Sequence, residues 1–124
     1  MHNTTLLASR RRIPVSDTIP VGRKLDASVA RRVGRAVGKL LSSGARACTI
    51  DMSGVETADS GGFGGLMMAL RKLEEVGAHA VVICANPKIR KLFEVATVSR
   101  FAPVVSRPED ARRLHAAVAS GLAS

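Results

Sequence analysis

The chain has 124 residues, of which 46% are hydrophobic, and its formal net charge is +9. This length suits one globular domain, and this composition excludes disorder along most of the chain. The chain has three Phe and no Tyr or Trp, which argues against a single-strand nucleic-acid binder because such proteins stack bases on aromatic rings.

The positive charge is concentrated in the first half of the chain. Residues 1–50 carry a net charge of +8, whereas residues 51–124 carry +1. A local basic region suggests an acidic partner, which could be a protein surface, a nucleic acid or anionic lipid. An ordinary solvated surface explains the same charge equally well.

The two cysteines, Cys48 and Cys84, both lie in apolar runs without CxxC spacing. They are therefore predicted to be buried thiols of a reducing compartment, with no disulfide and no metal site. No apolar run reaches the ~18 residues that a membrane helix needs. The first residues place their charges after a short apolar patch, the reverse of a secretory signal, so we expect a cytoplasmic protein.

The N-terminal region carries the weakest structural signals. Residues 1–12 predict a frayed basic segment, and residues 13–22 contain two prolines, which allow at most one or two short edge strands. We expect a single domain over residues 13–120, followed by a tail at 121–124.

Residues 26–44 predict a helix, with Asp26 or Ser28 as N-cap and Gly44 as the stop. One face is predicted to be apolar and to face the core: Val29, Val33, Val37, Leu40 and Leu41. The opposite face is predicted to be exposed and basic: Arg31, Arg32, Arg35 and Lys39.

Strands and helices alternate from there to the end of the chain. We expect a buried strand within 45–55, a helix over 60–77, a central strand within 78–86, a helix from Pro87, a short strand within 101–106 and a helix from Pro108. The residues expected to face the core from these helices are Phe63, Leu66, Met67, Leu70, Leu73, Ile89, Leu92, Phe93, Ala96, Ala111, Leu114 and Val118. The alternation predicts an α/β domain with a largely parallel sheet.

The segment "ADSGGFGG", residues 58–65, joins a buried strand to a helix at the carboxyl edge of this sheet, where sites tend to form. Ser60 is expected to be the N-cap, with Asp59 just outside the positive end of the helix. Turn and cap chemistry alone would explain this pair.

The glycines of this segment do not form a phosphate-binding loop. A P-loop needs a lysine directly after its last glycine, and here the next lysine is Lys72. The dinucleotide fingerprint would need a third glycine where Met67 stands.

Hydrolysis by Ser60 is not favoured either, because no GxSxG motif surrounds it. None of the three histidines, His2, His79 and His115, is an obvious general base for it. No His, Cys and Asp cluster has the spacing of a metal site. A serine on an exposed turn at a helix start suits phosphorylation better, since the added charge would alter any interface there.

The run "IDMSGVETADSGGFGGLMMALRKLEEVGAHAVVICANPKIRKLFEVATVSRF" and the upstream "KLDASVARRVGRAV" resemble a STAS domain of the anti-sigma-factor-antagonist type. The resemblance covers roughly residues 13–118, and "DMSGV…DSGGFG" is its specific part. It implies a small mixed sheet of four to five strands with helices mainly on one side. It also implies a protein-binding module without enzymatic activity, cofactor or metal.

In bacterial antagonists of this family, a serine kinase that is itself the anti-sigma factor phosphorylates the serine after the motif aspartate, and a phosphatase reverses this. The unphosphorylated form binds the anti-sigma factor. The serine corresponds to Ser60 and the aspartate to Asp59. The resemblance implies that the partner-binding residues are Asp59, Ser60, Gly61, Gly62, Phe63 and Gly64.

Other members of the family imply an alternative, in which the chain is a constitutive scaffold of a stress complex or a cytoplasmic subunit of a lipid-transport ATPase. Ser60 would then act only as cap and contact. Binding of nucleic acid or membrane through the basic helix is the less favoured hypothesis. The chain departs from the family pattern at Gly61, where a second hydroxyl is usual, at Phe63, where Leu or Ile is usual, and in its proline-broken N-terminal segment.

Overall fold

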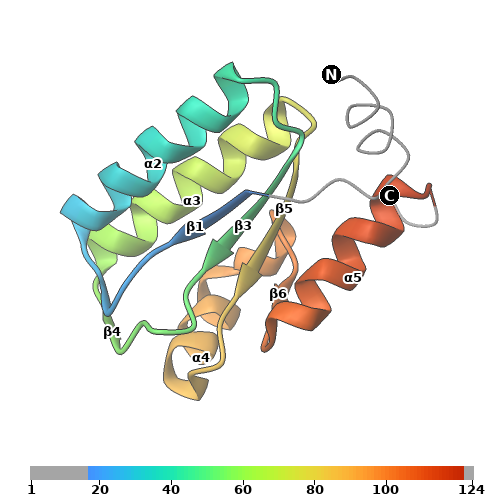
Figure 1. Ribbon diagram of the computed structural model, residues 1–124. Coiled ribbons are helices and arrows are strands. Elements are labelled where there is room, and N and C mark those ends of the chain that lie inside the picture. Colours follow the sequence, from blue (N-terminus) through green and yellow to red (C-terminus); the bar gives the residue numbers. More distant parts are fainter. Residues whose placement is uncertain (1–16, 122–124) are drawn as a thin grey trace.

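The computed structural model describes residues 17–121, and Figure 1 shows their arrangement. The predicted basic segment 1–12 and residues 122–124 of the predicted tail lie outside the described residues. In chain order the elements are β1 (Asp17–Pro20), β2 (Lys24–Leu25), α2 (Ala27–Ser42), β3 (Ala47–Asp51), β4 (Thr57–Ala58), α3 (Ser60–Glu75), β5 (His79–Ile83), α4 (Pro87–Ala96), η1 (Val98–Arg100), β6 (Val104–Val105) and α5 (Pro108–Ala119).

The main sheet has four parallel strands in the order β1-β3-β5-β6. Ile19 pairs with Ile50 across β1 and β3, and Thr49 pairs with Val81 across β3 and β5. A separate two-stranded parallel sheet joins β2 to β4. The predicted α/β fold with a largely parallel sheet is confirmed, and Pro20 stands in an edge strand as its missing N–H requires.

The two faces of the main sheet bury different amounts of apolar surface. Cys48, Ile50 and Val82 point into a large core that also holds the buried faces of α2, α3 and α4. Val81 and Ile83, the alternate residues of β5, point the other way and pack against Ala111 of α5. In Figure 1, α5 accordingly lies across the sheet from α2 and α3, so helices lie mainly on one side.

The helices begin and end where their local chemistry allows. The Asp26 carboxylate accepts a hydrogen bond from the Val29 N–H at 2.9 Å, which confirms Asp26 as a cap. Gly44 follows α2 with φ +89°, a conformation that glycine adopts without strain. Asn86 caps α4 by accepting from the Lys88 N–H at 2.9 Å, and Pro87 fills the first helical position.

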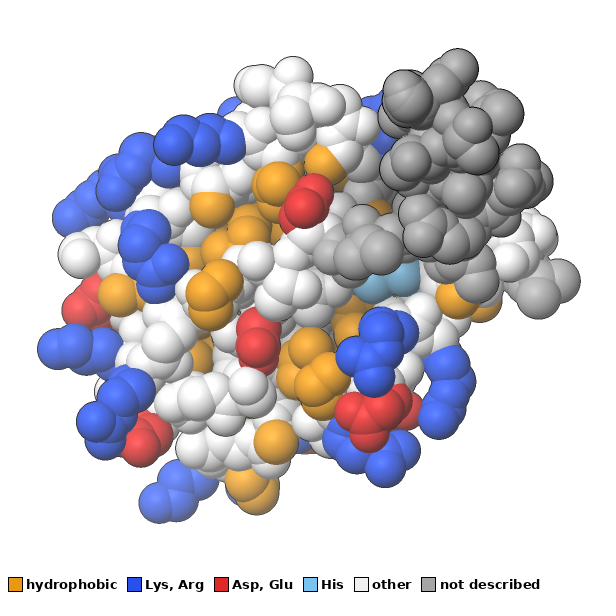
Figure 2. Space-filling model, viewed as in Figure 1, with side chains coloured by type: hydrophobic (Ala, Val, Ile, Leu, Met, Phe, Trp, Pro, Cys, Tyr) orange, Lys and Arg blue, Asp and Glu red, His pale blue; other side chains and the backbone are white. Residues whose placement is uncertain are grey.

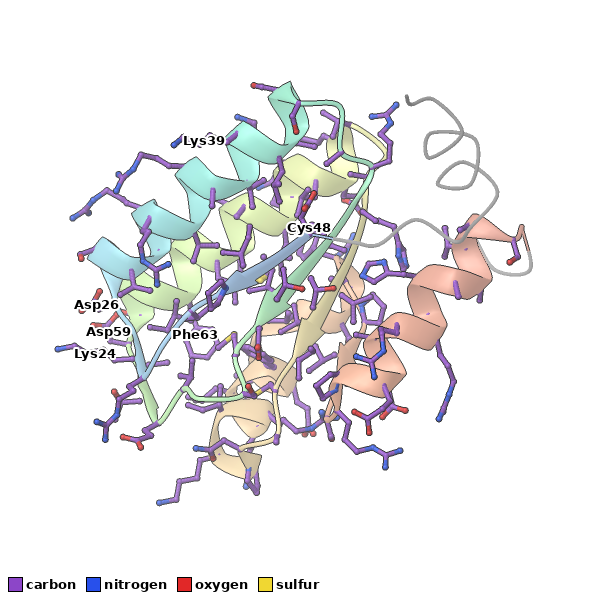
Figure 3. All side chains as sticks on the ribbon, viewed as in Figure 1. Lys24, Asp26, Lys39, Cys48, Asp59 and Phe63 are labelled. Carbon is purple, nitrogen blue, oxygen red and sulfur yellow. The ribbon has the colours of Figure 1, made fainter. Side chains whose placement is uncertain are left out.

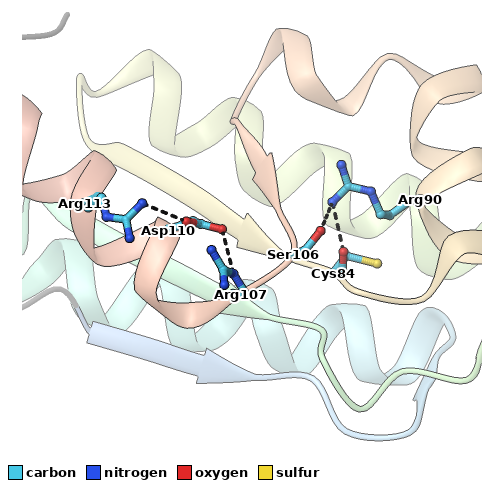
Figure 4. Close-up of polar contacts among 6 residues, drawn as sticks. All are labelled: Cys84, Arg90, Ser106, Arg107, Asp110 and Arg113. Atoms are coloured by element: carbon cyan, nitrogen blue, oxygen red, sulfur yellow. Dashed lines mark hydrogen bonds and ion pairs between the residues drawn. The ribbon is translucent and has the colours of Figure 1, made fainter.

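Two polar clusters lie at the starts of α4 and α5 (Figure 4). The Arg90 guanidinium donates to the Cys84 carbonyl at 3.1 Å and to the Ser106 hydroxyl at 3.2 Å. Asp110, in the first turn of α5, pairs with Arg107 and Arg113. These last pairs are exposed, so each contributes little to stability.

Some expectations for the second half of the chain are wrong in detail. Leu92 was expected in the core, but 43% of it is exposed. The strand expected within 101–106 spans only Val104 and Val105, because η1 and the turn after it precede them. Met67 packs against the core as expected, and both cysteines are free and buried. None of the helices in residues 17–121 is long and apolar enough to cross a membrane.

Candidate functional site

The two short strands β2 and β4 lead directly into the two long helices. β2 pairs with β4 through Lys24 with Thr57 and Leu25 with Ala58, and the next residue in each case is an aspartate that caps a helix. The Asp59 N–H also donates to the Leu25 carbonyl at 3.1 Å. This pairing places the starts of α2 and α3 side by side, as the neighbouring Asp26 and Asp59 in Figure 3 show.

Asp59, rather than Ser60, is the N-cap of α3, which corrects the expectation from the sequence. Its Oδ1 accepts a hydrogen bond from the Gly62 N–H at 2.8 Å, and its carbonyl accepts from the Phe63 N–H at 2.9 Å. A carboxylate in this position also carries a charge that the positive helix end favours. Ser60 therefore begins the helix with its hydroxyl not needed for the cap.

The side chain of Ser60 is exposed, and its hydroxyl makes no hydrogen bond to any of the residues that the structure describes. Asp59, Gly61 and Gly64 are exposed as well, so these four predicted partner-binding residues form one accessible surface at the start of α3. A phosphate on Ser60 would lie at the positive end of α3, which favours it, and close to the two capping carboxylates, which repel it.

Gly62 and Phe63, also predicted to bind a partner, pack against neighbouring elements. Gly62 is buried, and a Cβ there would overlap the Leu25 carbonyl. Phe63 is half-buried and meets Phe93 of α4 edge to face, with ring centroids 5.3 Å apart. These two residues bring α3 against β2 and α4, and so fix where Ser60 is presented.

The packing around Gly61 explains why the chain has glycine here, where a second hydroxyl is usual in the family pattern. A Cβ at this position would lie 3.2 Å from the Cβ of Ala27, the first residue of α2. That separation is tighter than ordinary packing, so a serine or threonine here would push the two helix starts apart slightly. The close pairing of α2 and α3 therefore favours glycine, which leaves Ser60 with the single hydroxyl of the turn.

A pair of histidines on the far side of the sheet was not predicted. His79 of β5 and His115 of α5 approach with their Nδ1 atoms 2.8 Å apart, and the His115 Nε2 lies 2.9 Å from the Thr49 hydroxyl. Burial lowers the pKa of both imidazoles. For His115, burial and the neighbouring His79 together lower the pKa to about 4. The two residues are 36 positions apart, so only the pairing of α5 with the sheet could reveal this contact.

These histidines border a cavity of about 410 Å³ whose other walls include Asp17, Arg46 and Val118. The cavity lies at the amino ends of β3 and β5, away from Ser60. No Cys, Ser or Thr is among the described residues that line it. Cys48 lies in the large core instead, where burial raises the pKa of its thiol to about 12.

Comparison with solved structures finds a similar fold in proteins that include anti-sigma factor antagonists. The crystal structure of an anti-sigma factor antagonist from Mycobacterium paratuberculosis superposes with a TM-score of 0.68 at 23% identity, covering 78% of this chain and 82% of that one. The antagonist SpoIIAA in its unphosphorylated form gives 0.58 at 19% identity, covering 80% and 88%. The Bacillus cell fate determinant SpoIIAA in its phosphorylated form gives 0.60 at 19% identity, covering 78% and 88%.

A comparison with curated protein sequences finds no significant match. The family model described as "Mlab, STAS domain" matches residues 9–106, which is most of the chain. That span includes both capping aspartates, Ser60 and every strand of the main sheet. The chain therefore belongs to the STAS domain family.

Proposed function

We propose that this STAS domain is a non-enzymatic antagonist that binds an anti-sigma-factor serine kinase and releases it when Ser60 is phosphorylated. The observation that carries the proposal is the exposed hydroxyl of Ser60, which Asp59 leaves free by capping α3 in its place. The likeness to SpoIIAA, a protein solved in unphosphorylated and phosphorylated forms, supports the same switch.

The mechanism follows from the position of Ser60. In the unphosphorylated protein, the exposed start of α3 offers a contact surface of Asp59, Ser60, Gly61 and Gly64, where the glycines allow a partner's backbone to approach closely. A phosphate adds nearly two negative charges and bulk at the centre of that contact. Because Asp59 rather than Ser60 caps α3, a phosphate on Ser60 takes the place of no capping group, so the change acts on docking and leaves the fold intact.

The test uses the purified chain, a serine kinase of the anti-sigma type from the same organism, and ATP. One phosphate should appear on Ser60 by mass spectrometry, and calorimetric binding to the kinase should be lost once it is present. Ser28 is the matched control, because it too is exposed and lies in the first turn of a helix capped by aspartate. If the kinase phosphorylates the Ser28→Ala variant but not the Ser60→Ala variant, the result supports the proposal. If Ser60 of the wild type stays unmodified, the result refutes it.

A second candidate is a constitutive scaffold or transporter subunit in which Ser60 is only a contact. The observation that favours it is the pair of capping carboxylates, Asp26 and Asp59, beside the position a phosphate would take. In this case Ser60→Ala leaves binding to the partner unchanged, whereas Ser60→Asp weakens it, and no kinase modifies the chain. The coupled kinase and binding measurements separate the two candidates.

A further inference from the structure

A long hollow runs between α2 and α3, starting beside Ser60 and extending away from it along the two helices. It has a volume of about 580 Å³, begins beside Ala27 and Gly61, and extends to Lys72. Lys72 also borders a second, more open hollow beyond it, which continues along α2 past Lys39. Together they form one groove along the outer side of the helix pair, which we call the α2–α3 groove.

Glycines line this groove where the fold itself does not require them. Gly34 and Gly64 line the first hollow and Gly38 the second, and a Cβ at any of the three would meet no atom within 4 Å. Glycine within a helix is destabilising compared with alanine. Gly65 differs, because a Cβ there would overlap Ala30. The first three glycines keep the groove open instead of helping α2 to pack on α3.

The groove also exposes apolar surface. Met68 borders it with 73% of its surface accessible, although the neighbouring Met67 packs against the core. Ala30, Val37 and Ala69 form part of its floor. A flexible thioether beside a floor of small residues suits an apolar side chain brought by another molecule.

Cations surround the groove. Arg31 and Lys72 border the first hollow, and Arg35 and Lys39 border the second. None of the four forms an ion pair within residues 17–121, and no carboxylate borders either hollow. Figure 2 shows Lys and Arg side chains projecting at the upper left, over α2. Arg32 is different, because its guanidinium is hydrogen-bonded to the carbonyls of Pro20 and Val21.

We infer that the α2–α3 groove binds an acidic amphipathic helix of a partner protein. Small and apolar side chains of that helix would lie over Gly34, Gly64 and Met68, and its flanking carboxylates would pair with Arg31, Arg35, Lys39 and Lys72. An open groove whose first hollow has an apolar floor and whose rim is cationic fits such a helix. A membrane or a nucleic acid would use the cations but not the floor. The inference does not depend on phosphorylation of Ser60.

A displayed library of ~16-residue peptides, long enough to form a helix, provides the probe. One face is fixed as leucine and alanine at helical spacing, and the flanking positions vary among Glu, Gln and Lys. Selection on the unphosphorylated chain should enrich Glu at the flanks. The best peptide should shift the amide resonances of residues 27–39 and 61–72, and a scrambled peptide of the same composition should bind at least about tenfold more weakly.

Matched variants locate the contact. Gly64→Leu fills the groove and Arg35→Glu reverses one rim charge, and each should weaken the peptide about tenfold or more. Arg112→Glu, which makes the same charge change on exposed α5, should leave binding unchanged. Met68→Ser repeats the test if Gly64→Leu lowers the melting temperature. The same result is expected on a Ser60→Ala background, so an absent phosphorylation switch would not affect it.

Several results would overturn the inference. Enrichment of Lys or Gln at the flanks, equal binding of the scrambled peptide, or resonance shifts elsewhere would show that the groove does not select an acidic helix. Tighter, Arg35-dependent binding of duplex DNA, or of vesicles with equal parts of phosphatidylglycerol and phosphatidylcholine, would assign the rim to those ligands. A dimer in light scattering that Met68→Ser dissociates would assign the groove to a second copy.

Discussion

At the scale of single residues, Asp59 and Ser60 have separate tasks at the start of α3. The Asp59 carboxylate accepts a hydrogen bond from the Gly62 N–H at 2.8 Å, and the Ser60 hydroxyl stays exposed. The sequence "DS" contains two good capping residues in a row, so local preference alone could not decide between them. The N-cap is set at Asp59 by β4, which ends at Ala58, and by the hydrogen bond from the Asp59 N–H to the Leu25 carbonyl.

Removal of the cap therefore gives the first prediction. Asp59→Ala should lower the free energy of unfolding by about 1 kcal/mol, because the Gly62 N–H loses its partner and the helix end its charge. Asp59→Asn should recover most of that loss. Ser60→Ala should change stability little. Urea denaturation followed by circular dichroism checks all three, and a larger loss for Ser60→Ala than for Asp59→Ala would make Ser60 the cap.

The neighbouring glycines give a second prediction. Gly62→Ala should destabilise the chain by about 2 kcal/mol or more, because its Cβ meets the rigid Leu25 backbone. Gly64→Ala should instead stabilise by up to about 1 kcal/mol, because its Cβ points into open space and alanine is the better helix former. Thermal melts of both variants make the comparison, and equal effects would contradict the difference in packing.

At the scale of elements, α5 is held on the sheet by a buried polar contact as well as by apolar packing. Both ring nitrogens of His115 are engaged, Nδ1 by His79 and Nε2 by Thr49. The groups around the pair include Asp17 of β1 and Arg46 before β3, which border the same cavity. If both rings were protonated, an N–H would face an N–H at 2.8 Å and the contact would be lost.

The pH dependence of stability follows from this contact. The pKa of His115 is about 4 in the fold against 6.5 as its ordinary value, so the unfolded chain takes up its proton first as the pH falls. The stabilisation is present above pH ~6.5 and is lost towards pH ~4, by up to about 3 kcal/mol. Urea midpoints measured across this range should fall for the wild type and much less for His115→Gln. An equal fall in both would show that other groups cause the loss.

The elements themselves were largely predictable, whereas several contacts between them were not. Helical spacing of Val33 and Val37 located α2, and the apolar run around Val82 located β5, because burial imposes these patterns locally. The pairing of β2 with β4 joins two strands of two residues each, too short to leave a pattern. The His79–His115 contact and the exposure of Leu92 likewise depend on how distant elements pack.

At the scale of the whole molecule, the sheet divides the domain into two unequal halves. The large core lies under α2, α3 and α4, and the smaller cluster on the other face contains Val81, Ile83 and Ala111 as its buried residues. Ser60 and the α2–α3 groove both lie on the side of the large core. The surfaces proposed to bind partners are therefore carried by the most extensively packed part of the described chain, and α5 is held more weakly.

This asymmetry predicts that α5 opens before the rest of the domain unfolds. Native-state hydrogen exchange should give the amides of α5 a lower opening free energy than those of β3 and β5, because opening α5 exposes little apolar surface. Both opening free energies should fall by a similar amount from pH 7 to pH 5, after correction for intrinsic exchange rates, because His115 can be protonated in the α5-opened state and in the unfolded state alike. In His115→Gln both opening free energies should fall much less over this pH range. Amides of α5 that exchange only with global unfolding would show that the smaller cluster is part of the same cooperative unit.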